Sequence, residues 1–285
     1  MRRSLLFIPA NRPAMLQNAD VFSADAVIFD LEDAVIPSEK DAATYLLNEF
    51  LNQFNHLIIE KIVRINAIDT PFFERDLKMM VSDHIDTIML PKATLSSVNQ
   101  LASLLSRIEK AKKMKKTIAI LPIIELARSI IEVDELAKAP RVNGLLLGAE
   151  DLATDLEVER TVIGNEIFYA RSKVIMAAKA NKIDAIDTPF THLDDEKGLV
   201  EDASFAKSLG MNAKACIHPS QIDHVNLVFS PTEKEILYAK KIIEAEKIAQ
   251  QEQKGAFSVD GKMIDKPIII RAHQLLEKAK QWKLL

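Results

Sequence analysis

The stretch "NGLLLGAED" (residues 143–151) joins a short apolar run to two acids at the point where the run ends. Its three consecutive leucines are typical of a buried strand, and Gly148 marks the end of that strand. Glu150 and Asp151 then follow where the chain would leave the core. The same order, a short apolar run, a few polar residues and a longer amphipathic segment, recurs along most of the chain.

This recurrence predicts a barrel. Short β-prone runs that alternate with amphipathic segments are typical of βα units and a parallel sheet. The predicted strands cover residues 5–9, 26–32, 61–67, 87–92, 118–125, 143–148, 184–189 and 213–218. Eight such units predict an α/β fold of the (β/α)8 TIM-barrel type. A doubly wound open sheet is the alternative, but the even spacing favours closure. The segment "FIPANRPAM" after the first strand also lacks the glycines of a dinucleotide-binding motif.

Helix signals lie between the predicted strands. Pro13 lies in a first helical turn, Ser38 is a predicted N-cap, Ser96 and Ser97 open a segment to Lys116, Asn165 begins a helix to Ala180, and Gly210 is a predicted C-cap. Two further helices, over about 231–253 and to about Lys283, exceed what a barrel needs. We therefore expect a TIM-barrel catalytic domain over residues 1–230. Residues 231–285 would form a helical extension that acts as a cap or an inter-subunit arm.

The composition limits the classes of function. The chain has 285 residues, of which 48% are hydrophobic and 27% charged, so it can bury a sizeable core. Its net charge of −4 gives no general attraction to nucleic acid. The single cysteine, Cys216, excludes a disulfide within the chain and fits a reducing compartment. No apolar run approaches the length of a membrane span. We expect a cytoplasmic protein that binds neither nucleic acid nor membrane.

Polar and ionisable residues close every predicted strand, whereas the amino ends of the strands show no comparable set. TIM-barrel enzymes build their active sites at the carboxyl ends of the strands. The residues at these ends are Asn11, Arg12, Glu32, Asp33, Arg64, Asn66, Pro91, Lys92, Glu125, Glu150, Asp151, Asp187, Thr188 and His218. The sequence therefore predicts an active site at this end of the barrel.

Glu125 and Asp151 close the fifth and sixth predicted strands, which would be neighbours about 4.8 Å apart. Two carboxylates at so short a distance repel each other unless one of them takes up a proton or a cation lies between them. Oxygen ligands from few protein carboxylates suit Mg²⁺, which keeps waters and takes further oxygens from its substrate. The alternative is that Asp151 caps a helix that begins near Leu152. Spacing alone leaves both possibilities open.

Arg64 lies inside the strand segment "IVRIN", where alternation puts Arg64 and Asn66 on one face. If Val63 and Ile65 face the helices, Arg64 points into the barrel and needs an anionic partner. That partner is either a substrate carboxylate or enolate oxygen, because a guanidinium binds planar oxyanions with two parallel hydrogen bonds, or a structural carboxylate at Glu32 or Asp33.

Together these segments resemble a known family. The segment "RRSLLFIPANRPAMLQNADVFSADAVIFDLEDAVIPSEKDAA" is similar to the N-terminal region of citrate lyase β subunits, within the HpcH/HpaI aldolase superfamily. The similarity continues in order through "VRIN", "MLPKA", "LPIIE", "LGAEDL", "AIDTPFTHLDDEKGL", "CIHPSQI" and "DGKMIDKPII", and so covers nearly the whole chain.

The resemblance implies a TIM barrel, a Mg²⁺ site and cleavage of a carbon–carbon bond in a 3-hydroxy-acyl thioester. It implies that Glu125 and Asp151 are the metal ligands and that Arg64 binds substrate and takes part in catalysis. Asp265 of the "GKMID" motif would act as general acid/base, in its own or a neighbouring subunit. The remaining expected substrate-site residues are Glu32 and Asp33 near the metal, Asn11 and Arg12 near the path of a phosphopantetheine arm, and Lys92.

The resemblance also implies the substrate and the partners. The expected reaction cleaves a citryl thioester on an acyl carrier protein into oxaloacetate and an acetyl thioester. The expected partners are the carrier subunit and an acyltransferase α subunit, with a homo-oligomer that is a trimer or a hexamer. One alternative is a lyase or thioesterase that acts on malyl-, citramalyl- or methylmalyl-CoA. Another is a non-catalytic assembly subunit.

Overall fold

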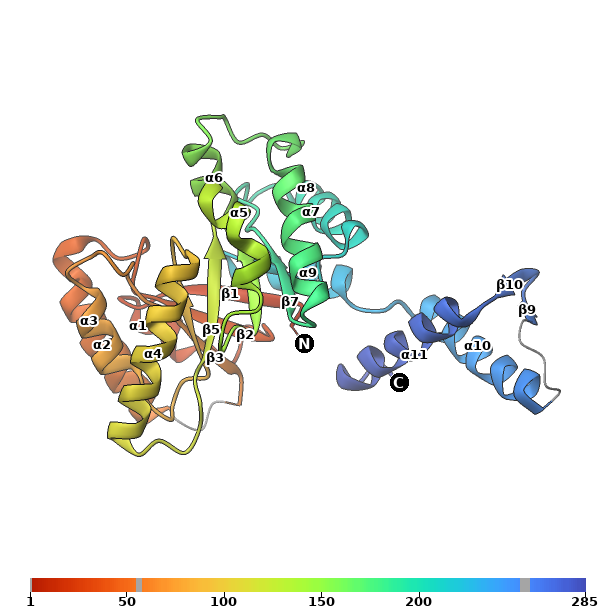
Figure 1. The fold of residues 1–285 in the computed structure, drawn as a ribbon, viewed down its shortest axis with the longest axis horizontal. Coiled ribbons are helices and arrows are strands. Elements are labelled where there is room, and N and C mark those ends of the chain that lie inside the picture. The colour runs from red at the N-terminus through yellow and green to blue at the C-terminus, as the bar shows by residue number, and fades with distance from the viewer. Residues whose placement is uncertain (1, 55–57, 252–256) are drawn as a thin grey trace. The chain divides into compact units, whose positions relative to one another are not determined.

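The computed structural model describes residues 2–54, 58–251 and 257–285. The strands β1 to β8 are parallel and close into a barrel in chain order (Figure 1). They are β1 (Ser4–Pro9), β2 (Ala26–Asp30), β3 (Glu60–Arg64), β4 (Thr87–Leu90), β5 (Ala119–Ile124), β6 (Gly144–Leu147), β7 (Asp184–Asp187) and β8 (Ala213–Cys216). The predicted TIM-barrel fold is confirmed.

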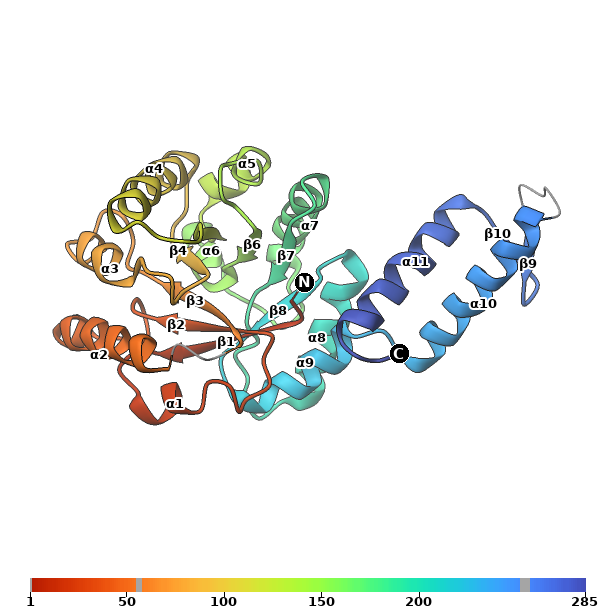
Figure 2. The same ribbon diagram turned by 90° about the horizontal axis from the view of Figure 1, so that it is seen from below.

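Helices follow the strands and lie outside them. Figure 2 shows α2 to α5, α7 and α8 around the ring of strands. The helices of this part of the chain are α1 (Pro13–Gln17), α2 (Lys40–Gln53), α3 (Phe73–Met80), α4 (Leu95–Lys112), α5 (Ala127–Leu136), α6 (Ala149–Asp155), α7 (Asn165–Ala180), α8 (Glu196–Leu209) and α9 (Ile222–Phe229). The 3-10 turns η1 (Pro37–Glu39) and η2 (Pro219–Gln221) precede α2 and α9.

The inside of the barrel is a packed apolar core rather than a channel. Because side chains alternate along a strand, the residue two positions beyond each core residue also points inward. At the carboxyl ends these next inward positions carry Arg64, Glu125, Gly148 and Thr188. The buried core residues are Leu5, Ala26, Ile28, Ile62, Met89, Leu121, Ile123, Leu146, Ile186, Ala213 and Ala215, with Phe7 packed against them.

The helix signals are confirmed in three places and wrong in two. Pro13 begins α1. α7 begins at Asn165, and Gly210 ends α8 with a φ of +119°. Ser38 is not an N-cap, because the chain first makes the turn η1 and α2 starts only after it. The serines at 96 and 97 lie inside α4: Thr94 is the N-cap and forms a reciprocal capping box with Ser97.

The amino end of the barrel carries a polar cluster that the sequence analysis did not expect. Arg2 donates to both carboxylate oxygens of Glu60, at 2.7 and 2.6 Å, and to Asp184 at 3.0 Å. Thr87 donates to Glu60 at 3.2 Å, and Asn143 donates to Thr87 at 3.2 Å. The expectation that the amino ends lack a polar set was therefore wrong. These five residues come from segments that only the closed barrel brings together.

A second buried network lies between the barrel and two helices. Lys214 of β8 is fully buried and donates to Asp187 at 2.7 Å and to Asp202 of α8 at 2.6 Å. Arg171 of α7 binds the same two carboxylates. Asp187, which the sequence analysis placed with the active-site end, thus faces the helices. The two cations and two anions balance in charge, which is the condition for burying them.

Replacing Lys214 with methionine is expected to lower the free energy of unfolding by about 3–5 kcal/mol, because two buried carboxylates would share one cation. Urea unfolding followed by circular dichroism measures the change. Lys197→Met is the matched control, since Lys197 makes an exposed pair with Glu201 at 3.6 Å, and it should leave the midpoint of unfolding unchanged. Equal midpoints for both variants would contradict a stabilising network.

The chain divides into two compact units, residues 1–226 and 227–285. The second unit packs α10 (Glu233–Gln251) against α11 (Lys266–Gln281). Between them lie the antiparallel strands β9 (Phe257–Val259) and β10 (Lys262–Ile264), in a segment that the sequence analysis expected to be a loop. Asp260 and Gly261 join the strands with positive φ at both residues, the conformation of a tight two-residue hairpin. The role of this unit as a cap or an arm stays a prediction.

Within the described residues, no helix is both long and apolar enough to cross a membrane.

Candidate active site

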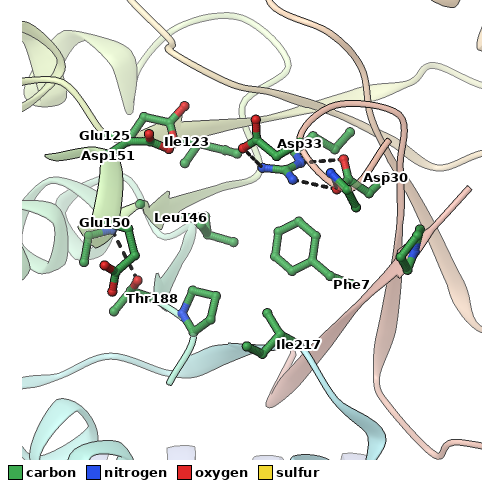
Figure 3. Close-up of a pocket in the computed structure, with 16 residues that line it drawn as sticks. Phe7, Asp30, Asp33, Ile123, Glu125, Leu146, Glu150, Asp151, Thr188 and Ile217 are labelled. Atoms are coloured by element: carbon green, nitrogen blue, oxygen red, sulfur yellow. Dashed lines mark hydrogen bonds and ion pairs between the residues drawn. The ribbon is translucent and has the colours of Figure 1, made fainter. Parts of the chain in front are cut away.

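A cavity of about 400 Å³ opens at the carboxyl end of the barrel (Figure 3). Apolar side chains form one part of its wall, and ionisable groups form another. Its lining comprises Phe7, Pro9, Asp30, Asp33, Ala34, Arg64, Ile123, Glu125, Leu146, Gly148, Ala149, Glu150, Asp151, Thr188, Pro189 and Ile217. This volume is within the usual range for a small-molecule site. Of the predicted site residues, the cavity brings together Asp33, Arg64, Glu125 and Asp151.

Glu125 follows β5 and is almost fully buried, with 3% of its surface exposed. Its Oε1 accepts a hydrogen bond of 2.5 Å from the backbone N–H of Lys92, a residue with a positive φ of 48° at the end of β4. Burial raises the pKa of Glu125 to about 8, the Lys92 bond opposes this shift, and repulsion from Asp151 adds to it. Glu125, after β5, and Asp151, in the helix after the neighbouring strand β6, line the same cavity.

Gly148 provides the space in which the Glu125 carboxylate lies. A Cβ atom added at Gly148 would come within 2.7 Å of both the Cβ and the Oε2 of Glu125, and within 2.9 Å of Ile123 Cγ2. Contacts that short do not occur between real side chains, so no larger residue fits without displacing Glu125. Gly148, which marks the strand end in the sequence, is thus needed because a larger residue would collide with Glu125.

Asp151 lies in the first turn of α6, the helix that begins directly after Gly148. The alternative that Asp151 caps this helix is wrong, because α6 starts at Ala149 and Gly148 occupies the N-cap position. Among the described residues, no side chain forms an N-cap hydrogen bond from that position. Asp151 instead contributes its carboxylate to the cavity that Glu125 lines.

Arg64 points into the barrel, as its alternation predicted, and is held there by an acid that the sequence analysis did not single out. Asp30 accepts from Arg64 Nε at 2.7 Å and from Nη2 at 2.6 Å. Asp30 also accepts from the backbone N–H groups of Glu32 and Ala34, so it fixes the loop and the guanidinium together. The ring of Phe7 lies 4.9 Å from the guanidinium carbon, on the cavity side.

The remaining edge of Arg64 faces the two acids that the sequence predicted as its partners. Nη1 lies 3.0 Å from Glu32 and 3.4 Å from Asp33. Burial raises the pKa of Glu32 to about 7, while the charge of Arg64 opposes the shift. Glu32 Oε2, the atom 3.0 Å from Nη1, is buried, and among the described residues it makes this ion pair without a hydrogen bond of good geometry. The end of β2 therefore concentrates more negative charge than Arg64 alone neutralises.

These features fit a divalent cation with oxygen ligands. Glu125 and Asp151 present carboxylates to one cavity, and burial, with a smaller contribution from the charge of Asp151, raises the pKa of Glu125. Within the described residues, His, Cys, Asp and Glu form no group of three poised to hold an ion. Mg²⁺ is commonly held by one or two carboxylates together with water and substrate oxygens, so a pair of acids suffices.

The other predicted site residues lie outside the cavity lining. Asn11 donates to Glu39 at 2.5 Å in the turn after β1, and Arg12 next to it is exposed. The side chain of Lys92 is exposed, although its backbone holds Glu125. Asp265 belongs to the second unit, where it caps α11 by accepting from the N–H of Ile268 at 3.2 Å. Their roles stay predictions.

The raised pKa values of Glu125 and Glu32 predict how the stability of the protein depends on pH. Between pH 4.5 and about 8 the folded protein holds protons on Glu125 and Glu32 that the unfolded chain has lost. The metal-free protein is therefore expected to lose stability as the pH rises through this window. Mg²⁺ competes with the same protons, so its affinity should rise over the same range.

Thermal unfolding at a series of pH values, with and without Mg²⁺, measures both effects. Glu125→Gln is the control, because an amide can still accept from Lys92 but cannot titrate. This variant should unfold with a flatter pH dependence and gain little from Mg²⁺. A slope equal to that of the unchanged protein would show that Glu125 does not titrate in this window.

Comparison with known proteins identifies relatives over the whole chain. The sequence model of the family described as HpcH/HpaI aldolase/citrate lyase matches residues 3–219. The citrate lyase subunit beta of Leuconostoc mesenteroides subsp. cremoris is 41% identical over 282 residues, which cover 98% of this chain and 93% of that protein. The L-malyl-CoA/beta-methylmalyl-CoA lyase of Cereibacter sphaeroides is 33% identical, with 97% and 94% covered.

Solved structures agree with the sequence relatives. Protein CitE from Mycobacterium tuberculosis, in complex with magnesium, acetoacetate and coenzyme A, is similar with a TM-score of 0.80 and 31% identity, and the match covers 98% of each chain. The citrate lyase beta subunit from M. tuberculosis, complexed with oxaloacetate and magnesium, is similar with a TM-score of 0.69 and 32% identity. That match covers 81% of this chain and 97% of the other.

Proposed function

The chain belongs to the HpcH/HpaI aldolase/citrate lyase family, and we propose that it is a magnesium-dependent lyase that cleaves a citryl thioester on an acyl carrier protein. The products are oxaloacetate and an acetyl thioester. The observation that carries the proposal is the meeting of Glu125, Asp151 and Arg64 in one cavity at the carboxyl end of the barrel. An acid pair that can hold a cation and a guanidinium that can hold an oxyanion are the two groups this cleavage requires.

Glu125 and Asp151 would hold the Mg²⁺, with Glu32 and Asp33 close to its waters. Bound there, Mg²⁺ would supply Lewis-acid stabilisation for negative charge on the substrate hydroxyl oxygen and would orient the adjoining carboxylate. The protein contributes a fixed carboxylate at Glu125, which lies in the space at Gly148 and accepts a hydrogen bond from the Lys92 N–H. The hydroxyl proton would pass to a base, for which Asp265 is the candidate. As it leaves, the hydroxyl-bearing carbon becomes a ketone, the carbon–carbon bond breaks, and the bond electrons stay on the thioester fragment as an enolate.

Arg64 would stabilise the oxygen of that enolate, a charge that is absent from the ground state. Asp30 occupies Nε and one side of Nη2, so the guanidinium cannot swing with the substrate. Asp265 would then protonate the enolate carbon to give the acetyl group. Asp265 would act from its own subunit or from a neighbouring one in a trimer or hexamer. Asn11, Arg12 and Lys92 would contact the arm that carries the acyl group.

The specificity of the enzyme depends on whether its acyl group is carried by an acyl carrier protein or by CoA. Relatives that act on malyl-CoA esters retain similarity over nearly the whole chain, so a CoA thioester of malate, citramalate or methylmalate is the second candidate. Higher identity to a citrate lyase subunit beta favours the citryl-carrier substrate and, with it, an assembly with a carrier subunit and an acyltransferase α subunit. A non-catalytic assembly subunit would have no need of the Arg64, Glu125 and Asp151 cavity.

The test is to incubate the purified chain with Mg²⁺ and matched citryl, malyl, citramalyl and methylmalyl thioesters, each on an acyl carrier protein and on CoA. Oxaloacetate release is followed by its enzymatic reduction with NADH, and other products by mass spectrometry. Fastest Mg²⁺-dependent release of oxaloacetate from the citryl-carrier protein is the expected result. Preference for a CoA ester would favour the second candidate. No turnover of any thioester, even with the partner subunits added, would contradict a catalytic role.

A further inference from the structure

Thr188, at the carboxyl end of β7, makes a contact that none of the functions above has used. It is 1% exposed and lines the active-site cavity. Its Oγ1 accepts a hydrogen bond of 3.2 Å from the backbone N–H of Ala149, the first residue of α6 (Figure 3). The bond therefore joins the end of β7 to the turn that carries Asp151.

The helix α6 needs this bond because it cannot provide its own cap. The first N–H groups of a helix have no partner within the helix, and a side chain at the N-cap position usually satisfies one of them. Here the N-cap residue is Gly148, and any side chain at that position would collide with Glu125. Because the Glu125 side chain fills the space beside Gly148, the helix that carries Asp151 has no side chain at its N-cap position. The Thr188 hydroxyl supplies the missing acceptor from the next strand.

Thr188 is itself fixed from the side opposite the cavity. Its backbone carbonyl accepts from the buried ammonium group of Lys214 at 2.7 Å, and the same ammonium binds Asp187. The end of β7 is therefore held by a buried ion network and cannot follow α6 if the helix shifts. A helix of seven residues has little stability of its own, so its first turn depends on this attachment for its position.

We propose that Thr188 is a positioning residue for the metal site: its hydroxyl holds the first turn of α6, and with it Asp151, at the place where Asp151 and Glu125 share one cation. This inference rests on the proposed function, because it concerns the Mg²⁺ site assigned there. Thr188 acts through Asp151, and its effect is on the affinity for the cation before any substrate binds. Loss of a contact that orients a metal ligand typically lowers metal affinity about 10- to 100-fold.

The experiment is direct titration of the purified full-length protein with Mn²⁺, followed by electron paramagnetic resonance, without substrate. Thr188→Val keeps the shape of the side chain and removes the hydroxyl, and its Kd for Mn²⁺ should rise about 10- to 100-fold. Thr188→Ser keeps the hydroxyl and should bind nearly as the unchanged protein does. The Mg²⁺ concentration for half-maximal lyase activity should rise in the valine variant, with kcat at saturating Mg²⁺ largely recovered.

Thr232→Val is the matched control. Thr232 accepts from the N–H of Glu235 at 3.2 Å at the start of α10, so the same bond is lost at a helix start in the other unit. Its Mn²⁺ affinity should equal that of the unchanged protein. If Thr188→Val does not fold, Thr188→Ala removes the hydroxyl without adding volume and is judged by the same Kd.

The outcomes separate the two proposals. No Mn²⁺ binding by the unchanged protein would overturn the metal site, and the proposed function with it. Binding by the unchanged protein and equal binding by the valine or alanine variant would overturn the role of Thr188 alone. An equal loss in the serine variant would also overturn it, because the hydroxyl would then not be the cause. A loss in valine with recovery in serine supports it.

Discussion

Replacing Arg64 with alanine is expected to lower kcat about 100- to 1,000-fold, the usual cost of removing one donor to an oxyanion that forms in the transition state. The same change leaves Asp30, which is 1% exposed, without its guanidinium partner. Breaking a buried pair from one side costs about 3–5 kcal/mol of stability. The rate is therefore measured per folded molecule, with folding checked by circular dichroism at each temperature used.

Two further variants separate the catalytic from the structural effect. Arg64→Lys keeps a positive charge beside Asp30 but cannot donate two parallel bonds, so it should recover stability more than rate. Arg2→Ala removes a comparable buried arginine, bonded to both oxygens of Glu60 at the other end of the barrel. It should lower stability and leave kcat unchanged. A folded Arg64→Ala protein with normal kcat would exclude the oxyanion role.

Replacing Gly148 with alanine is expected to abolish most Mg²⁺-dependent activity with the addition of a single methyl group. The new Cβ would lie 2.7 Å from two atoms of Glu125, so the carboxylate must move away from the cavity. Overpacking of this kind costs about 1–3 kcal/mol of stability. Because a metal ligand is displaced, Mn²⁺ affinity should fall by more than the 10- to 100-fold typical of lost supporting contacts.

Gly144→Ala is the matched control, because Gly144 begins β6, the strand that Gly148 directly follows, and lies near the amino end of the barrel. A Cβ there would approach Leu121 Cδ1 at 3.0 Å and both Arg2 Nη1 and the backbone carbonyl of Asp184 at 3.3 Å, and none of these atoms belongs to the metal site. We expect lower stability with unchanged Mn²⁺ affinity. If both alanine variants bind Mn²⁺ alike, the space at Gly148 has no bearing on the metal site.

The barrel could be predicted because its signals are local. Apolar alternation within four to six residues is enough to mark a strand, and the eight strands occur where the sequence put them. The predicted strands extend too far at their carboxyl ends, as at β2, which was expected over 26–32 and ends at Asp30. Alternation continues into the polar residues there, where single backbone bonds such as that from the Leu31 N–H to the Arg64 carbonyl remain but the regular strand pairing ends. The overrun contains three of the residues that build the site, Glu125, Gly148 and Thr188.

The contacts that complete the site could not be predicted, since each depends on which strand lies next to which. Asp30 was overlooked beside Glu32 and Asp33, although its place two residues after the inward Ile28 was a usable signal. Gly148 was taken as a strand end and Thr188 as one polar residue among many. Gly148 matters because the side chain of Glu125, after the neighbouring strand β5, fills the space beside it. Thr188 matters because its hydroxyl accepts a hydrogen bond from Ala149 of α6.

The closed amino end of the barrel has a kinetic consequence for the proposed reaction. Between the Arg2 cluster and the active-site cavity lies a packed layer of core side chains, so within the described part of the barrel reactants arrive and depart through its carboxyl end. Once the carbon–carbon bond is broken, the fragment seated deeper cannot leave until the shallower one has vacated the passage. Departure is thus ordered by depth, and product-inhibition kinetics would reveal which fragment goes last.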